Sequence, residues 1–178
     1  NLVWLGSGES NAPTYSFAGC GVYKSTDGGK SWRHMGLAAT RHIARLVIDP
    51  QDNDTVYAAA VGNLLGADAN RGVYKTEDGG NTWQKVLFIS EKTGVIDLVM
   101  DPHRRGTLYA AAWQRERKPW QFSAAGPESG IFKTTDGGKT WEKSGLGFPV
   151  SRHVGRIGRP FSRPNPPVAL PLPATQEA

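Results

Sequence analysis

The hydrophobic residues of this chain occur in short runs that are separated by Gly and Asp residues. Several of these runs are rich in β-branched and aromatic residues, among them ARLVI (44–48), TVYAAAV (55–61) and GVYKT (72–76). Runs of about four to eight residues with turn-forming residues at both ends are typical of β-strands. No long stretch combines helical periodicity with capping signals. The pattern therefore predicts an all-β protein.

The strand pattern repeats along the chain. HIARLVIDPQDNDTVYAAAVG (42–62) aligns without a gap with GVIDLVMDPHRRGTLYAAAWQ (94–114), and both stretches contain Asp-Pro. Proline lacks the N–H donor that a strand interior needs, so Asp-Pro marks the end of one strand and the turn to the next. Each full unit predicts four short antiparallel strands. Units of this kind, repeated head to tail, predict the blades of a β-propeller.

The repeat divides the chain into blades. Residues 1–158 form the predicted propeller segment, with a partial blade over 1–36, whole blades over 41–90 and 93–146, and the start of a further blade over 152–158. In residues 159–178 the repeat stops, and six of the chain's 12 prolines fall between Pro160 and Pro173. This proline density predicts an irregular tail. We expect an open arc of about three blades, cut from a longer protein.

A nine-residue motif occurs three times, as KSTDGGKSW (24–32), KTEDGGNTW (75–83) and KTTDGGKTW (133–141). Its Asp can accept the backbone N–H two residues on, its glycines supply positive φ, and its Trp can lock the hairpin against the blade. Three equal copies argue for a structural role, because an active site needs one constellation. The residues assigned this structural role are Ser25, Asp27, Gly29, Trp32, Thr76, Asp78, Gly80, Trp83, Thr134, Asp136, Gly138 and Trp141.

The three motifs resemble the Asp-box, or bacterial neuraminidase repeat, of sialidases, xyloglucanases, sortilin-type propellers and photosystem-assembly factors. The sequence segments around them, such as WLGSGESN and GVYKSTDGGKSW, resemble those of large secreted bacterial proteins that carry sortilin-like or glycosyl-hydrolase labels. The resemblance covers residues 1–158. It implies a propeller, a box on a peripheral hairpin away from the site, and a secreted, periplasmic or cell-surface location.

Two functions stay open at this point. The first is a non-catalytic propeller segment of a larger protein, which binds protein or glycan ligands or acts as a scaffold. The second is part of a glycoside hydrolase, sialidase- or xyloglucanase-like, that acts on polysaccharide. Hydrolysis needs two carboxyl groups about 5–9.5 Å apart. The sequence does not pair the available carboxylates, which are Glu9, Asp68, Asp97, Glu116 and Glu128, so the catalytic residues stay unknown.

The long, non-repeated loops predict where a ligand would bind. In an up-and-down blade, the loops over 6–19, 62–71 and 114–129 lie on the face opposite the motif hairpins. Variable loops on a rigid scaffold commonly carry function. The candidate ligand-binding residues are Glu9, Arg41, His42, Trp113, Arg115, Arg117, Trp120, Arg152 and His153. The alternative is that Trp113 and Trp120 pack between blades and that the charges are solvated. Arg45, Asp97 and Arg156 predict an inter-blade ion network or, alternatively, an anion site.

Composition excludes several classes of protein. The net charge of +5 comes from scattered Lys and Arg without a basic block, which argues against nucleic-acid binding. No apolar run approaches the ~20 residues of a membrane span. Cys20 is the only cysteine, so no internal disulfide can form, and the four histidines lack zinc-site spacing. We therefore expect no cofactor and no metal, with the remaining blades and a glycan or peptide as partners.

Overall fold

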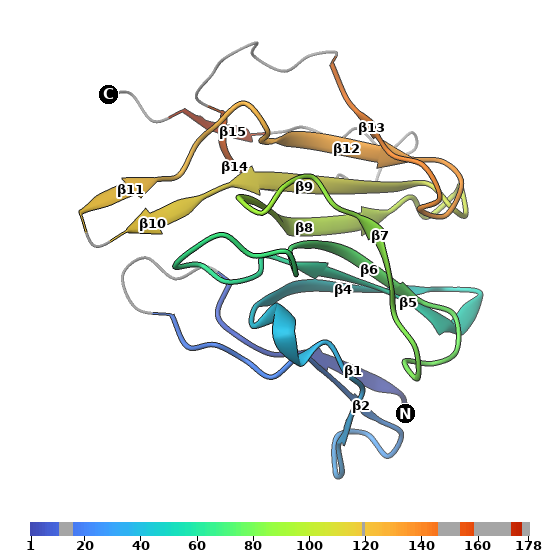
Figure 1. The fold of residues 1–178 in the computed structure, drawn as a ribbon. Coiled ribbons are helices and arrows are strands. Elements are labelled where there is room, and N and C mark those ends of the chain that lie inside the picture. Colours follow the sequence, from blue (N-terminus) through green and yellow to red (C-terminus); the bar gives the residue numbers. More distant parts are fainter. Residues whose placement is uncertain (11–15, 119, 146–153, 159–171, 176–178) are drawn as a thin grey trace.

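The computed structural model describes residues 1–10, 16–118, 120–145, 154–158 and 172–175. Within these ranges the chain forms fifteen β-strands and one short 3-10 helix, η1 (Ala38–Thr40). Most of the strands belong to three antiparallel sheets that lie one above the next (Figure 1). We call these sheets the first, second and third blade.

Each blade is a meander of neighbouring strands. The first blade contains β1 (Val3–Gly6), β2 (Val22–Ser25) and β3 (Arg33–His34). The second contains β4 (Ile43–Asp49), β5 (Asp52–Ala60), β6 (Gly72–Thr76) and β7 (Gln84–Leu87). The third contains β8 (Thr93–Met100), β9 (Leu108–Gln114), β12 (Gly130–Thr134) and β13 (Glu142–Lys143). The four-stranded antiparallel units that the sequence predicts are therefore present.

The core lies between the blades, and β5 shows why. Successive residues of a strand point to opposite faces of its sheet. Ala58 and Ala60 are buried in a cluster with Val22 of the first blade, whereas Ala59 is buried in a cluster with Val95 of the third blade. Because the second blade is covered on both faces, the buried part of β5, Val56–Ala60, is apolar at every position, and its small side chains let the sheets approach.

The three Asp-box hairpins share one hydrogen-bond pattern, seen most simply at Asp78. Its carboxylate accepts the N–H of Thr82 at 2.9 Å and the hydroxyl of Thr82 at 2.6 Å. Thr76 donates its hydroxyl to Asp78 at 2.8 Å and accepts the N–H of Gly80 at 2.9 Å. The predicted bond to the amide two residues on is wrong in register. The carboxylate instead spans four residues, and the Ser or Thr before it binds the glycine amide.

Two positive-φ glycines complete each hairpin, as the motif predicts. In the second blade they are Gly79 at 69° and Gly80 at 95°. A Cβ atom on Gly80 would lie 2.7 Å from the ring of Trp4 in the first blade. The second glycine is therefore needed for the close approach of two blades as well as for the turn.

The Asp-box Trp packs against the preceding blade rather than only against its own hairpin. Trp83 donates its indole N–H to the carbonyl of Met35 at 2.7 Å, and its ring meets Trp4 edge-on with centroids 6.4 Å apart. Trp141 likewise packs against the core cluster between the second and third blades. Trp32, in the first blade, is 42% exposed. The Trp of the motif thus joins the second and third blades to the blade that precedes each of them.

The tail prediction needs one correction. β15 (Leu172–Thr175) pairs antiparallel with β14 (Val154–Gly158), so four of the residues predicted to be irregular form a strand. β14 also packs on the third blade, where Ile157 joins the cluster that contains Trp113. β15 follows the repeated units in the sequence. It can pair with β14 despite Pro173, because an edge strand tolerates the loss of one N–H donor. The rest of 159–178 lies outside the described residues.

We predict that Trp83→Ala lowers the free energy of unfolding by about 3 kcal/mol, because it empties a half-buried site between two blades and leaves the Met35 carbonyl without its donor. The matched variant Trp32→Ala should cost less than about 1 kcal/mol, since this ring is largely exposed. Urea unfolding followed by circular dichroism measures both. Equal losses would contradict the assignment of Trp83 to the junction.

We also predict a pH dependence that originates in the Asp-boxes. Hydrogen bonds from Ser or Thr at the fourth position after each Asp lower the pKa of Asp27, Asp78 and Asp136 below the usual 3.8. The folded state therefore favours the carboxylates, and this stabilisation is present at neutral pH and is lost as the pH falls below about 4. Asp78→Asn should lower the melting temperature by roughly a few degrees at pH 7 and spare ligand binding. At pH 2.5 the difference from the parent chain should be smaller; a constant difference would rule out the carboxylate as its origin.

Candidate functional site

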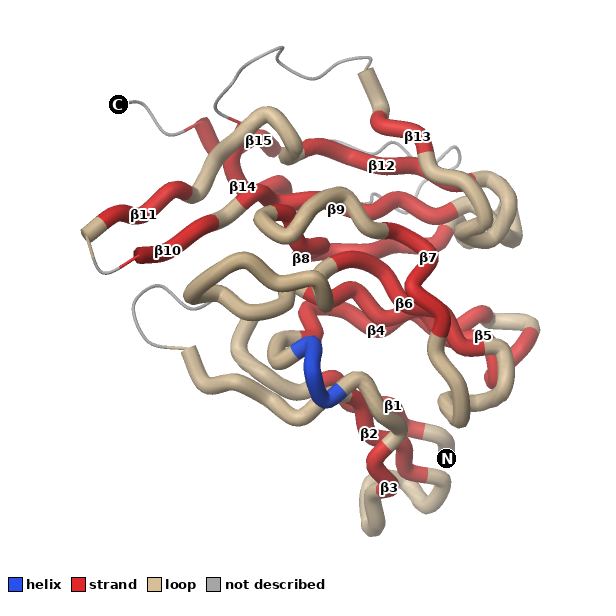
Figure 2. The backbone as a smooth tube through the Cα atoms, viewed as in Figure 1, coloured by secondary structure: helices blue, strands red, loops and turns tan. Residues whose placement is uncertain are grey.

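The long loops of the three blades lie on the side opposite the Asp-box hairpins. In Figure 2 the loops after β1 and β5, and the segment after β9, extend to the left, while the short turns lie on the right. The segment after β9 was predicted to be a loop, but it contains a hairpin of β10 (Glu116–Lys118) and β11 (Gln121–Ser123). The insertions thus gather on one face, as the strand order requires.

These loops enclose a cavity of about 330 Å³, which we call the loop-face cavity. Segments from all three blades line it, and the sequence predicts four of its lining residues as ligand-binding. The residues that define its chemistry are Phe17, Arg41, His42, Leu65, Arg115 and Arg117. Residues distant in the sequence therefore meet at one cavity.

Arg41 lines the cavity, and its backbone has a strained conformation. Its φ is 58° and its ψ is −44°, a conformation that residues with a side chain rarely adopt. The carbonyl of Arg41 accepts the N–H of Gly19 at 2.6 Å, which ties the residue to the loop after β1. Strain of this kind persists where the surroundings hold it, and it is frequent at ligand sites.

His42 is buried beside Arg41 and is held at both ring nitrogens. Nδ1 lies 2.9 Å from the carbonyl of Gly62, so it carries the proton, and Nε2 lies 3.1 Å from Oγ of Ser16. Burial lowers the pKa of His42, and the charges of Arg41 and Arg115 act in the same direction. His42 is therefore a neutral, positioned hydrogen-bonding group at pH 7.

Arg115 and Arg117 are stacked with aromatic rings. The guanidinium of Arg115 lies 5.1 Å from the Trp113 ring centroid and 5.4 Å from that of Phe122. The guanidinium of Arg117 lies 5.3 Å from the same Phe122 centroid. Such contacts orient the charges. Burial, and next the charge of Arg117, lower the pKa of Arg115, which is only 2% exposed.

The remaining predicted residues divide into buried, exposed and undescribed ones. Trp113 is buried and donates its indole N–H to the carbonyl of Ala124 at 2.7 Å, as the packing alternative predicts. Trp120 is 80% exposed beyond β10, contrary to that alternative. Glu9 is exposed and accepts the N–H of Phe17 at 3.3 Å. Arg152 and His153 lie outside the described residues.

Sequence reasoning missed Arg71, which fixes the loop-face cavity from behind. This arginine is 1% exposed and donates to the carbonyls of Asn63, Gly66, Lys92 and Arg115 at 2.7–3.3 Å. It therefore ties the second blade's long loop to the third blade. The sequence gives only a weak indication of this role. Arg71 stands directly before the glycine that opens the Gly-apolar-aromatic triplet, where the other two blades have Cys20 and Ser129.

The candidate carboxylates are already engaged. The carboxylate of Asp97 in β8 lies 2.9 Å from Nε of Arg45 in β4. Of the two alternatives for these residues, an inter-blade ion network and an anion site, the structure therefore shows the inter-blade ion pair. Glu128 accepts hydroxyls from Ser90 and Thr93. Glu116 lies 3.4 Å from Lys118 and 3.9 Å from Lys92.

Asp68 is likewise engaged, because its carboxylate accepts the backbone N–H groups of Asn63 and Asn70. Burial alone would raise the pKa of Asp68, but these bonds lower it on balance. The five carboxylates thus have structural partners.

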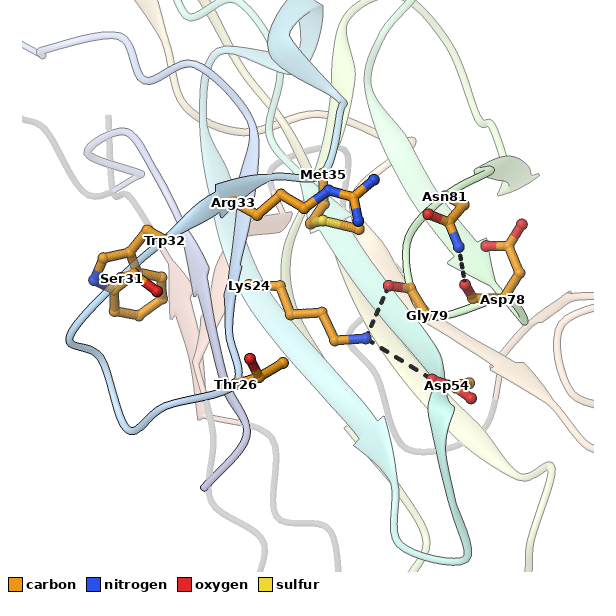
Figure 3. A pocket seen from close by; sticks show the side chains of 10 residues that line it. All are labelled: Lys24, Thr26, Ser31, Trp32, Arg33, Met35, Asp54, Asp78, Gly79 and Asn81. Carbon is orange, nitrogen blue, oxygen red and sulfur yellow. Dashed lines mark hydrogen bonds and ion pairs between the residues drawn. The ribbon is translucent and has the colours of Figure 1, made fainter.

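A larger cavity, of about 530 Å³, lies between the first two Asp-boxes (Figure 3). Lys24 crosses it and donates to the carbonyl of Gly79 at 3.1 Å, and its ammonium lies 3.8 Å from Asp54. Tyr57 makes the corresponding bond to Gly137 at 3.0 Å in the next junction. Because its polar contacts are those of a blade junction, we assign this cavity a structural role.

The described ranges contain no group of three or more His, Cys, Asp or Glu side chains that could hold a metal ion. They also contain no helix long and apolar enough to cross a membrane.

Comparison with known proteins identifies related sequences. A family model described as Sortilin, neurotensin receptor 3 (Sortilin-Vps10) matches residues 20–155. Xyloglucanase Xgh74A of Acetivibrio thermocellus is 28% identical over 138 residues, which is 68% of this chain and 16% of that protein. A probable oligoxyloglucan-reducing end-specific xyloglucanase of Neosartorya fischeri is 31% identical over 140 residues, 72% of this chain and 15% of the relative. The chain thus spans under one sixth of the relatives' length.

A solved structure confirms the fold class. The crystal structure of an ancestral GH74 enzyme superposes with a TM-score of 0.60 at 20% identity, over 88% of this chain and 19% of that one. Together with the three antiparallel blades, this likeness establishes a partial β-propeller.

We predict that Arg71→Met lowers the free energy of unfolding by about 3 kcal/mol or more, because four carbonyls lose the hydrogen bond from the Arg71 guanidinium inside the protein. Hydrogen exchange should rise across residues 62–71 before the rest of the chain opens. Arg33→Met, at an exposed position, is the matched control. Unchanged exchange in the loop would show that Arg71 does not pin it.

Proposed function

Because the chain belongs to the Sortilin-Vps10 family, we propose that it is a propeller segment of a larger, secreted glycoside-hydrolase-type protein and that its loop face binds polysaccharide. The observation that carries this proposal is the exposure of aromatic rings on that face. Phe17 is 77% exposed in the cavity wall, and Trp120 and Phe122 are exposed on the β10–β11 hairpin. Exposed aromatic rings offer flat apolar surface with polar edges nearby, which suits the apolar faces of sugar rings.

The relatives support a polysaccharide ligand. Two proteins named as xyloglucanases align with about two thirds or more of the chain. Xyloglucan is therefore the first polysaccharide to test. A binding role fits better than a catalytic one within this segment, since the five candidate carboxylates have structural partners in the hairpins, loops and ion pairs described above.

A peptide ligand is the second candidate. The description of the matching family names a receptor, and the loop-face cavity combines cationic with apolar side chains, as peptide-binding surfaces often do. The exposed rings favour the glycan, because they extend beyond the cavity along the hairpin.

The open face of the first blade fits a further Asp-box blade. Trp83 and Trp141 fill junctions with a preceding blade, whereas the equivalent Trp32 is exposed. In both internal junctions, the carbonyl of the first box glycine accepts a bond from the preceding blade. We expect the Trp32 face to be buried by another blade in the same manner in the full protein.

We predict that Trp120→Ala weakens binding of xyloglucan oligosaccharide by roughly tenfold, because the ring loses its stacking surface. Isothermal titration calorimetry of the 178-residue chain measures the affinity. Trp32→Ala, another exposed Trp but on the box side, should leave it unchanged. Unchanged binding in Trp120→Ala, with an unchanged melting curve, would remove the β10–β11 hairpin from the site.

A further inference from the structure

β15 pairs with β14 in the register that the second strand of a whole blade takes. In the second and third blades, a bulge lies between two pairs of residues that are three apart on the first strand and two apart on the second. β14 and β15 repeat this offset. The equivalent pairs are Ile43–Ala60 and Leu46–Ala58 in the second blade, Val95–Ala112 and Leu98–Ala110 in the third, and Val154–Thr175 and Ile157–Pro173 between β14 and β15. β14 therefore lies as the first strand of a fourth blade, with β15 in the place of a second strand.

β15 is an incomplete substitute for such a second strand. The sheet of β14 and β15 has only two strands, whereas the second strand of a whole blade is followed by a third and a fourth strand. A sheet of two strands is marginally stable by itself. Pro173 also removes one backbone donor, at the position where both whole blades have alanine. A strand that belongs to a larger sheet can therefore compete with β15 for β14.

β1 is a second strand that has no first strand beside it in the described residues. Val3 of β1 lies opposite Ser25 of β2, just as Val56 of β5 lies opposite Thr76 of β6. β5 pairs with β4 along its other side, but β1 is the edge strand of its sheet. The unpaired N–H and C=O groups of such an edge are a template for a strand from another chain.

The apolar face beside this edge is the face that a preceding blade would cover. Val3 and Leu5 are 38% and 44% exposed, whereas the equivalent residues of β5, Val56 and Ala58, are buried. Ala58 is buried against the first blade, which precedes its own. Trp32 is exposed as well, although the other two Asp-box Trp residues pack against a preceding blade. A preceding blade would therefore cover the edge of β1 and this face together.

The other end of a second copy offers the matching surface. Figure 1 places β1 and β14 at opposite ends of the stack of blades, so the two strands of one chain do not meet. In the first junction, Lys24 donates to the carbonyl of Gly79, the first box glycine of the next blade. Lys133 has the same motif position in the third blade, and Gly28 is the first box glycine of the first blade. Two copies joined at both ends would give a ring of about six blades, within the roughly 4–8 blades of closed propellers.

We propose that two copies of this chain associate head to tail, with β1 of each copy replacing β15 on β14 of the other. The register sets Leu5 opposite Ile157 and Trp4 opposite Gly158. The first blade of one copy then stacks on the third blade of its partner. This inference rests on the proposed role of the chain as a propeller segment whose Trp32 face is covered by another blade, and it identifies that blade as the third blade of a second copy.

Sedimentation equilibrium of the 178-residue chain over about 1–100 μM tests the association. We expect a species of twice the chain mass that dissociates on dilution, with no larger species, because the ring is closed. Leu5→Lys should weaken the association at least about tenfold, since it places a charge in the junction. Leu65→Lys, at an exposed apolar residue of the loop face, is the matched control. A monomer at every concentration, or an equal effect of the two variants, would overturn the proposal.

Cross-linking between single-cysteine variants locates the contact. Cys20→Ser removes the only cysteine, and in this background Leu5→Cys is mixed with Ile157→Cys under oxidising conditions. A disulfide-linked dimer should form in the mixture but with neither variant alone, because opposed residues of an antiparallel pair lie about 4.5–5.5 Å apart at Cβ. Phe17→Cys, exposed on the loop face, takes the place of Leu5→Cys in the control mixture. Equal yields from the two mixtures would contradict the proposed register.

A variant of β15 tests the exchange of strands. The N–H groups of consecutive strand residues point to opposite edges, so Ala174→Pro next to Pro173 removes the one that faces β14. This change should make the dimer form at a several-fold lower concentration, because β15 competes less well. Unchanged or weaker association would show that β1 does not replace β15, and the proposal would fail.

Calorimetry with xyloglucan oligosaccharide separates this inference from the proposed function. Leu5→Lys lies away from the loop face, so it should bind the sugar like the parent chain. A chain that binds xyloglucan and remains monomeric would overturn the inference alone. A dimer that does not bind xyloglucan would overturn the proposed polysaccharide ligand and support the inference.

Discussion

The packing of one blade on the next is the constraint on which this structure depends. A single sheet of two to four short strands cannot bury its own apolar residues, so each blade is stable only when its faces are covered. The junctions meet this need with the same parts: an Asp-box Trp that packs against the preceding blade, a box glycine that lies close to a side chain of that blade, and a donor from that blade to the carbonyl of the other box glycine. The Ala triplets of β5 and β9 follow from the same need, because only small side chains fit between close sheets.

The junctions also decide where chemistry can occur. The Asp-boxes use the polar groups of one side for turn bonds and blade contacts, which leaves the opposite loops free to vary. The loops on that side are held in place by buried contacts. Buried Arg71 joins two blades through four carbonyls, and the strained Arg41 is tied to the loop after β1. A loop face held in this way can present side chains in fixed positions before any ligand arrives.

Sequence could predict what the repeat encodes. The fold class, the blade as a four-stranded meander, and the glycine conformations follow from period-2 runs and turn chemistry. The partner blade of Trp83 and the strand at Leu172–Thr175 did not follow, because they depend on contacts between distant residues. The register of the Asp bonds is local, but the motif alone does not decide whether the carboxylate accepts the N–H group two or four residues further on. For the site, loop length placed Arg115 and Arg117 on one face, and the order of the strands placed the inter-blade residues Arg41 and His42 on the same face. It could not show that they share a cavity, or that Arg71 supports it, since both facts depend on loop conformation.

The second and third blades diverge at cavity residues, whereas their scaffold positions coincide. When the gapless alignment is extended by one residue at each end, Arg41 corresponds to Thr93, His42 to Gly94 and Asn63 to Arg115, while the Asp-Pro and Ala positions are the same. The Arg-His pair returns at Arg152 and His153, where the next unit of the repeat begins. Positions that bury one blade against the next face the same demand in every blade and keep the same residue type. A ligand that binds at one place does not constrain the residue type at the equivalent positions of the other blades. The residues around it are free to differ from one blade to the next, and here they differ by acquiring guanidinium and imidazole groups on one face.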